Sequence, residues 1–114
     1  MSGQFVPVLT LSAIATGAIV AERFVNTALA QAGAQANTLG VARSDAAVGA
    51  VCPVDSLGTA IVQSGAAIAA GAALETDANG RAVTRTTGPT VARMAPGEVA
   101  TAANQRIEVI LIPN

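Results

Sequence analysis

Residues 49–62 read GAVCPVDSLGTAIV, and residues 71–84, 22 positions further along the chain, read GAALETDANGRAVT. In both copies a glycine opens the unit, an Asp and a second glycine follow at the same spacing, and an alanine with an apolar neighbour closes it. An Asp-x-x-Gly segment is typical of a tight turn, because Asp bonds nearby backbone and Gly accepts a positive φ. This internal repeat therefore predicts two copies of a β-turn-β unit, with turns at 55–58 and 77–80.

Other β-rich segments flank the repeat. Pro7 makes the first of them an edge strand or an extended arm, because proline cannot donate to a sheet ladder. The last contains an apolar run at 109–112 that occupies both faces, which predicts a central strand or a subunit contact. Together the segments predict a mainly β fold, a small β-barrel or β-sandwich of repeated hairpins with at most one short helix. The flanking strands are predicted over residues 5–11, 20–25, 39–42, 90–95 and 107–112.

Two alanine-rich stretches are ambiguous. Residues 27–38 could form a plain loop or a short helix over 27–31. Residues 66–73 have the alanine content of a helix, but Gly71 interrupts them at the position where the repeat places a strand start. We therefore expect loop or strand in the second stretch.

The composition describes one modest domain. The 114 residues form a single domain over 1–114, in which 1–8 could be an extended N-terminal arm. Hydrophobic residues make up 52% of the chain, but much of this is alanine, and Phe5 and Phe24 are the only aromatic residues. Burial of alanine removes little apolar area from water, so we expect a small core with support from neighbouring chains. Cys52, in an apolar run, is predicted to be a buried, inert thiol.

The side chains needed for catalysis are nearly absent. The sequence has no His, so neither a Ser-His-Asp nor a Cys-His arrangement can form. It also lacks the glycine spacing of phosphate-binding loops. Glu75 and Asp77 lie two residues apart and could hold a hard cation, but we expect them to cap a turn and face solvent. The sequence therefore predicts no enzyme, no cofactor and no metal.

The charge pattern also excludes several partners. The net charge is −1, and two aromatic residues are too few for the stacking that single-stranded nucleic acid requires. Residues 1–21 carry no charged side chain but are interrupted by polar residues, Gly and Pro, so we expect mature structure rather than a membrane span or a secretory signal. All six basic residues are Arg, which suits paired contacts at interfaces, although scattered surface charges are the alternative.

The order of segments resembles that of small tailed-phage capsid decoration proteins, also called structural cement proteins. The residues that carry the resemblance lie at 3–11, 23–25, 39–42, 58–62, 65–71, 76–82 and 107–113. The resemblance implies a non-enzymatic β-rich protein in the virion, on the outer surface of the phage capsid. It further implies binding at junctions of major capsid protein subunits, stabilisation of the expanded head, and self-association, as a homotrimer or a dimer.

The candidate contact residues come from the arm and from the arginines. Pro7 and the small polar residues before it favour an extended contact segment, although this segment could equally be an edge strand of the domain; deleting residues 2–5 is expected to weaken capsid binding. A small ligand- or glycan-binding β-barrel module, which needs a pocket with convergent polar groups, and an enzyme accessory domain stay open as alternatives. The candidate capsid or oligomer contacts are Ser2, Gly3, Gln4, Phe5, Arg23, Arg43 and Arg93.

Overall fold

The computed structural model describes residues 6–114, which form β-strands joined by turns and loops. These residues contain no helix, and therefore none that is long and apolar enough to cross a membrane. The mainly β fold predicted from the sequence is confirmed. In chain order the strands are β1 (Pro7–Ile14), β2 (Phe24–Asn26), β3 (Thr38–Ala42), β4 (Val51–Gln63), β5 (Ala73–Thr76), β6 (Ala82–Thr84), β7 (Ala92–Met94) and β8 (Arg106–Leu111).

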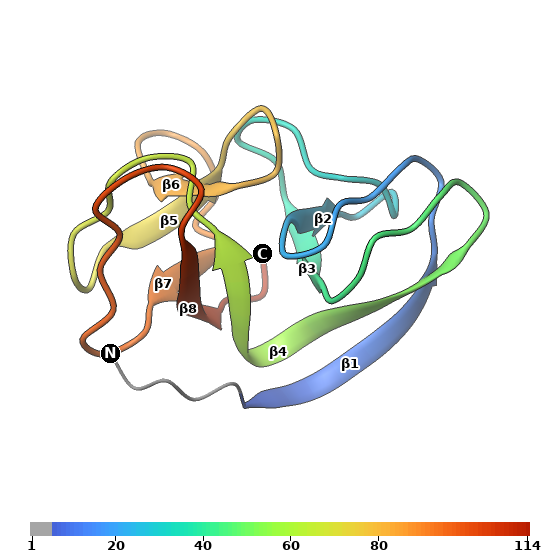
Figure 1. Cartoon of the computed structure of the whole chain (residues 1–114), viewed down its shortest axis with the longest axis horizontal. Coiled ribbons are helices and arrows are strands. Elements are labelled where there is room, and N and C mark those ends of the chain that lie inside the picture. The colour runs from blue at the N-terminus through green and yellow to red at the C-terminus, as the bar shows by residue number, and fades with distance from the viewer. Residues whose placement is uncertain (1–5) are drawn as a thin grey trace.

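The paired strands are antiparallel and form a sheet that curls into a nearly closed barrel (Figure 1). The strand order is β2-β3-β4-β8-β7-β5-β6, and β1 pairs with β4. The two ends of the sheet meet where the Phe24 amide donates to the Gly80 carbonyl at 2.7 Å, just before β6. The Ala32 amide donates to the Phe24 carbonyl at 2.9 Å and holds the loop after β2 on the same seam. Of the two architectures that the hairpin pattern allows, the chain adopts the barrel.

β4 organises the sheet because it pairs with three other strands. Its first half pairs with β1 and β3, and its second half, from Thr59 to Gln63, pairs with β8. Gly58 lies between the halves with a φ of +92°. A Cβ at this position would lie 2.4 Å from the Val6 carbonyl oxygen and 2.7 Å from the Val8 nitrogen. Glycine is therefore required here both by the backbone conformation and by the close approach of β1.

The predicted turn at 55–58 is wrong, because β4 runs through these residues as one strand of 13 residues. Asp55 does not bond the local backbone as a turn residue would. Its buried carboxylate instead accepts hydrogen bonds from the Thr10 hydroxyl and the Arg43 Nε, both at 2.8 Å. These contacts tie β1 and the end of β3 to β4 and keep the segment extended.

The second copy of the repeat does form the predicted hairpin, in which β5 pairs with β6. Asp77 Oδ1 accepts hydrogen bonds from the Asn79 and Arg81 amides, both at 2.8 Å. Gly80 has a φ of +74°. The turn at 77–80 is thus confirmed, and it forms by the Asp and Gly chemistry that predicts it.

The other strands lie near their predicted positions, with one shift. β3, β7 and β8 lie within two residues of their predicted bounds, and β8 is central in the sheet, between β4 and β7. β1 is an edge strand that begins at Pro7 and continues to Ile14. The strand predicted over 20–25 begins only at Phe24, because Glu22 has a φ of +62°, which interrupts an extended backbone.

Of the ambiguous stretch 27–38, residues 27–37 form the loop that closes the barrel and Thr38 begins β3, so no helix forms there. The Thr76 hydroxyl donates to the Gly33 carbonyl at 2.6 Å and accepts from the Ala36 amide at 3.0 Å. The Gln35 amide donates to the Thr76 carbonyl at 2.9 Å. The loop therefore lies along β5 and covers the gap between the two ends of the sheet.

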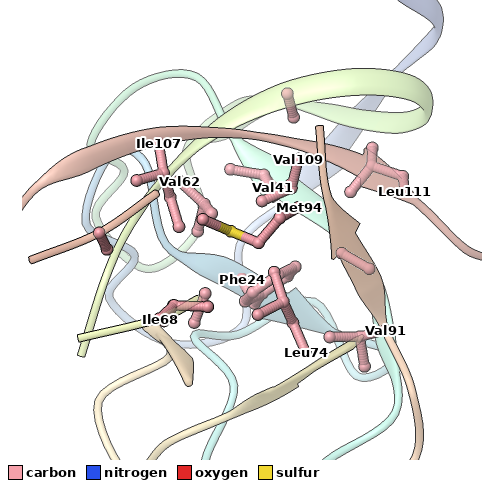
Figure 2. Packing of buried hydrophobic residues seen from close by; sticks show 14 of the residues in the cluster. Phe24, Val41, Val62, Ile68, Leu74, Val91, Met94, Ile107, Val109 and Leu111 are labelled. Atoms are coloured by element: carbon pink, nitrogen blue, oxygen red, sulfur yellow. The ribbon is translucent and has the colours of Figure 1, made fainter. Parts of the chain in front are cut away.

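The barrel interior holds an apolar cluster to which β2 to β8 all contribute. Phe24 is fully buried and lies close to Leu74 and Met94 in the middle of the cluster (Figure 2). Branched aliphatic side chains and alanines fill the remaining space, which agrees with the small core expected from the composition. The other members are Ala32, Val41, Ala60, Val62, Ile68, Ala82, Val91, Ala92, Ala100, Ile107, Val109 and Leu111.

A second, smaller cluster lies under the ribbon made by β1 and the first half of β4. Half of its members are alanines, so it buries little apolar area for its size. Leu29 and Leu39 pack against it and stay partly exposed. Cys52 is fully buried here, which confirms its predicted burial. The members are Ala13, Ala15, Ile19, Val25, Ala42, Ala46, Cys52 and Val54.

Substituting Gly58 by alanine tests the bend in β4. We expect Gly58→Ala to lower the free energy of unfolding by about 2 kcal/mol or more, because backbone strain at positive φ adds to the clash with β1. Gly49→Ala is the matched control, since Gly49 has a φ of +86° but open space where a Cβ would lie. It should cost only the strain, about 1 kcal/mol. Equal losses in denaturant unfolding would contradict the close-approach argument.

Candidate functional site

Exposed apolar side chains are concentrated on one part of the described surface. Seven of the ten large apolar residues that are exposed lie on β1, β4 or β8 or directly before β1. Contiguous exposed apolar area marks interaction surfaces more often than isolated apolar residues do. The seven are Val6, Val8, Leu9, Ile14, Val51, Leu57 and Ile110.

Five of these residues meet at the bend of β4, and we refer to them as the apolar band: Val6, Val8, Leu9, Leu57 and Ile110. Leu9 lies opposite Leu57 in the β1–β4 pairing, and Ile110 lies opposite Thr59 in the β4–β8 pairing. The Thr59 amide donates to the Val6 carbonyl at 3.0 Å, and Val8 lies against Gly58. Three consecutive residues of β4 thus bring together residues from three separate parts of the chain.

Arg93 extends the apolar band by one strand. It lies opposite Ile110 in the β7–β8 pairing, and directly paired residues project from the same face of a sheet. Its side chain is exposed, and its Nη1 donates to the Gly71 carbonyl at 3.1 Å. A row of outward residues therefore runs from Arg93 through Ile110 and Thr59 to Val6, with a guanidinium at one end.

The predicted arm residues, Ser2, Gly3, Gln4 and Phe5, lie outside the residues that the structure describes. The chain joins the apolar band directly after them, at Val6. Val6 to Val8 run beside β4, so this part of the predicted arm is continuous with the edge strand. Contact by residues 2–5 stays a prediction.

The other two candidate arginines lie apart from the apolar band. Arg43 is paired with the buried Asp55 carboxylate at 2.8 Å. Arg23 donates from Nε to Gln63 Oε1 at 2.9 Å and from Nη1 to the Asn79 carbonyl at 3.0 Å, across the seam of the barrel. The structure therefore gives both residues contacts within the fold, and brings only Arg93 onto the row of outward residues.

An open groove of about 490 Å³ lies next to the last residues of β1, and we refer to it as the edge groove. Among the described residues that line it, the Ser12 hydroxyl is the one polar side-chain group. Because a small-molecule site needs several convergent polar groups, the edge groove does not favour the ligand- or glycan-binding alternative. Its lining residues are Leu11, Ser12, Ala13, Ile14, Leu29 and Leu39.

The two carboxylates of the cation hypothesis have separate structural roles. Asp77 caps its turn as predicted, and its Oδ2 pairs with Arg81 Nε at 2.9 Å. The prediction that Glu75 faces solvent is wrong, because this carboxylate is buried and accepts hydrogen bonds from the Thr86 amide at 3.0 Å and the Gly88 amide at 2.9 Å. Among residues 6–114 no three His, Cys, Asp or Glu side chains are grouped as metal ligands would be.

The environment of Glu75 favours its ionised form. Burial raises the pKa of this carboxyl, but the hydrogen bonds from Thr86 and Gly88 outweigh burial and hold the pKa below its ordinary value. The Gln35 side chain also donates to it, at 3.5 Å. The carboxylate thus fixes the loop after β6 from inside the fold.

Sequence reasoning missed most of the apolar band. Leu57 lies in the segment predicted to be a turn, and a turn gives no reason to place it beside Leu9. Ile110 belongs to a run that is apolar on both faces, and that pattern is the available signal for an outward contact. The sequence places Val8 and Leu9 on an edge strand but does not predict which face of the sheet each side chain occupies. In the structure, bulges in the pairing with β4 disturb the alternation of side chains on which such a prediction depends.

The described part of the chain is a small β-barrel with an exposed apolar band and few charged side chains. The sequence profile of the phage cement proteins matches residues 3–113 of this chain. The chain therefore belongs to the phage cement protein family, whose members are structural proteins of the phage capsid. The family resemblance stated from the sequence is confirmed.

A solved structure supports the fold independently. The chain is similar to the N base of head fiber gp8.5 in bacteriophage phi29, with a TM-score of 0.72 and 18% sequence identity. The likeness covers 91% of this chain and 93% of that chain. No curated protein matches the sequence. At this identity the likeness shows the shared fold, and the family assignment comes from the profile.

Protonation of Glu75 should weaken the fold in acid. Because its folded-state pKa is the lower one, its stabilising contribution is complete above about pH 4.3, the ordinary pKa of glutamate, and is lost as the pH falls below it. We expect Glu75→Gln to be less stable than the natural chain by about 1–3 kcal/mol at neutral pH. The difference should shrink between roughly pH 5 and pH 3 in denaturant unfolding. A constant difference across this range would contradict the role of the carboxylate.

Proposed function

We propose that this protein binds the outer surface of a phage capsid, at junctions of major capsid protein subunits, and stabilises the expanded head. It acts as a homo-oligomer, a trimer or a dimer. Membership of the phage cement family supports association with the capsid. The finer statements, the outer surface, the junction and the oligomer, are parts of the proposal.

The observation that carries the proposal is the apolar band at the bend of β4. Four of its five residues lie on paired strands, and Val6 directly precedes one, so little backbone freedom is lost when they bind. An apolar surface on a rigid sheet suits a close-packed protein junction. The Arg93 guanidinium at the edge can form planar, bidentate bonds with a carboxylate of the partner.

Stabilisation of one state of the shell follows from differential binding. A protein that binds the expanded shell better than the unexpanded shell shifts the equilibrium towards expansion by mass action. Subunit junctions change their shape when a shell expands, so a contact that spans a junction can discriminate between the two states. Repetition over many equivalent junctions allows each contact to be modest in area.

Cosedimentation with capsids tests the proposal directly. The purified protein should bind saturably to expanded capsids that lack it and should not bind to unexpanded shells. Expanded capsids with bound protein should also withstand heating better than bare capsids. Binding to neither kind of shell would contradict the proposed function.

Substitutions on the apolar band test which surface makes the contact. Val8 is 74% exposed, so Val8→Ser should leave the fold intact, and we expect it to weaken capsid binding about five- to tenfold through lost apolar burial. Arg93→Ala should weaken binding to a similar degree. Val99→Ser is the matched control, since Val99 is also exposed, at 49%, but lies in the loop before β8. Equal effects of Val8→Ser and Val99→Ser would contradict the assignment of the surface.

A further inference from the structure

The turn at 77–80 contains a chemically reactive dipeptide, Asn79-Gly80. Asparagine is among the thermolabile residues of proteins, because the nitrogen of the next peptide bond can attack its side-chain carbonyl carbon. A following glycine favours this attack, since it has no side chain to block the approach and leaves the backbone free to rotate. Of the five asparagines in the chain, Asn79 is the one that precedes a glycine.

Asn79 also has the least restrained side chain of the five. It is exposed, and within residues 6–114 its side-chain amide forms no hydrogen bond. A free amide can rotate until its carbonyl carbon faces the Gly80 nitrogen. The other four side chains each form at least one hydrogen bond that restrains the amide group; they belong to Asn26, Asn37, Asn104 and Asn114.

The backbone of the dipeptide, in contrast, is held by the seam of the barrel. The Gly80 amide donates to the Asp77 carbonyl at 3.1 Å, and the Gly80 carbonyl accepts from the Phe24 amide at 2.7 Å. Arg23 ties the same turn to the seam, because its Nη1 donates to the Asn79 carbonyl at 3.0 Å. Attack requires the Gly80 nitrogen to lose its proton and turn towards the Asn79 side chain, so these bonds must open first.

We propose that Asn79 is a deamidation site whose reaction is gated by opening of the barrel seam. The Gly80 nitrogen forms a bond to Asn79 Cγ, and the side-chain nitrogen takes up the proton that the Gly80 nitrogen gives up and leaves as ammonia. Water then opens the resulting cyclic succinimide at one of its two carbonyl carbons. The net change is one water consumed and one ammonia released, so the reaction needs water as its only co-reactant.

The two products of ring opening differ in their effect on the seam. Opening at Cγ restores an ordinary peptide bond and leaves an aspartate, whose carboxylate can pair with Arg23. Within residues 6–114 this arginine forms no ion pair with an acidic side chain. Opening at the backbone carbonyl leaves isoaspartate, which lengthens the main chain by one carbon. The longer chain displaces the Gly80 carbonyl from the Phe24 amide, so isoaspartate weakens the seam.

Peptide mapping tests the site. The purified protein is incubated at mildly alkaline pH, either folded or in denaturant, and is then digested with trypsin and analysed by mass spectrometry. Trypsin cleaves after arginine, so Asn79 falls in the peptide 44–81, which contains no other asparagine. In both states we expect this peptide to exchange NH₂ for OH several-fold faster than the peptides that contain the other asparagines. The exchange should be slower in the folded protein, because the seam holds the turn.

Asn79→Gln is the control for the assignment to this residue. The peptide 44–81 also contains Gln63, and the substitution should abolish the mass change if Asn79 alone reacts. A folded protein in which another asparagine reacts faster would overturn the proposal. So would a folded protein in which the peptide 44–81 stays unmodified while the denatured chain reacts to completion.

Two arginine variants test the gating by the seam. Arg23→Ala removes the bond to the Asn79 carbonyl, so we expect the folded variant to deamidate several-fold faster than the natural chain. Arg85→Ala is the matched control, because Arg85 also donates to a backbone carbonyl, that of Gly88 at 2.8 Å, but lies at the far end of β6 from the turn. It should react like the natural chain. In denaturant all three chains should react at one rate, and equal rates in the folded state would overturn the gating.

The stability of the products tests the link to the seam independently of capsid binding. Deamidation adds one negative charge to a chain with a net charge of −1, so ion exchange separates the reacted chains from the natural ones. We expect the isoaspartate fraction to unfold at a lower denaturant concentration than the natural chain, and Asn79→Asp to unfold at no lower concentration. An isoaspartate fraction as stable as the natural chain would overturn the role of this turn in the seam.

Discussion

The structure depends on the close approach of the β1 backbone to β4 at Gly58. The residue takes a φ of +92° and has no room for a Cβ, since backbone atoms of Val6 and Val8 lie within 2.7 Å of that position. This bend lets one strand serve two parts of the sheet, with β1 and β3 on its first half and β8 on its second. Without it, the β1–β4 ribbon and the barrel could not share a strand.

The barrel closes through its loops as much as through its strands. Both ends of the sheet are short, with three residues in β2 and three in β6. The hydrogen bond from the Phe24 amide to the Gly80 carbonyl joins them. The loop over residues 27–37 covers this junction and is held there by hydrogen bonds to Thr76. Short edges bridged in this way present few unpaired backbone groups. β1 differs from them, because it is longer and, in the described part of the chain, no strand pairs with its outer edge.

Stability and the proposed binding use different residues of the same ribbon. Inward side chains such as Cys52 and Val54 fill the second cluster, while Leu9 and Leu57 point outward as a pair. The ribbon therefore carries apolar residues on both faces, and one of these faces covers the core. In the proposed binding mode, the rigid sheet supplies apolar contact and Arg93 supplies a directional group at the margin.

The sequence by itself determined the β class, the 77–80 turn, the edge position of β1, the central position of β8 and the burial of Cys52, because these depend on local chemistry and hydrophobicity. Tertiary structure decided the rest. The Asp-x-x-Gly pattern of Asp55 and Gly58 predicts a turn, but pairing with distant strands holds it extended, and its Asp bonds Thr10 and Arg43 instead. The apolar band exists only after folding, since contacts between residues as distant as 6, 59 and 110 depend on strand register, which no local pattern encodes.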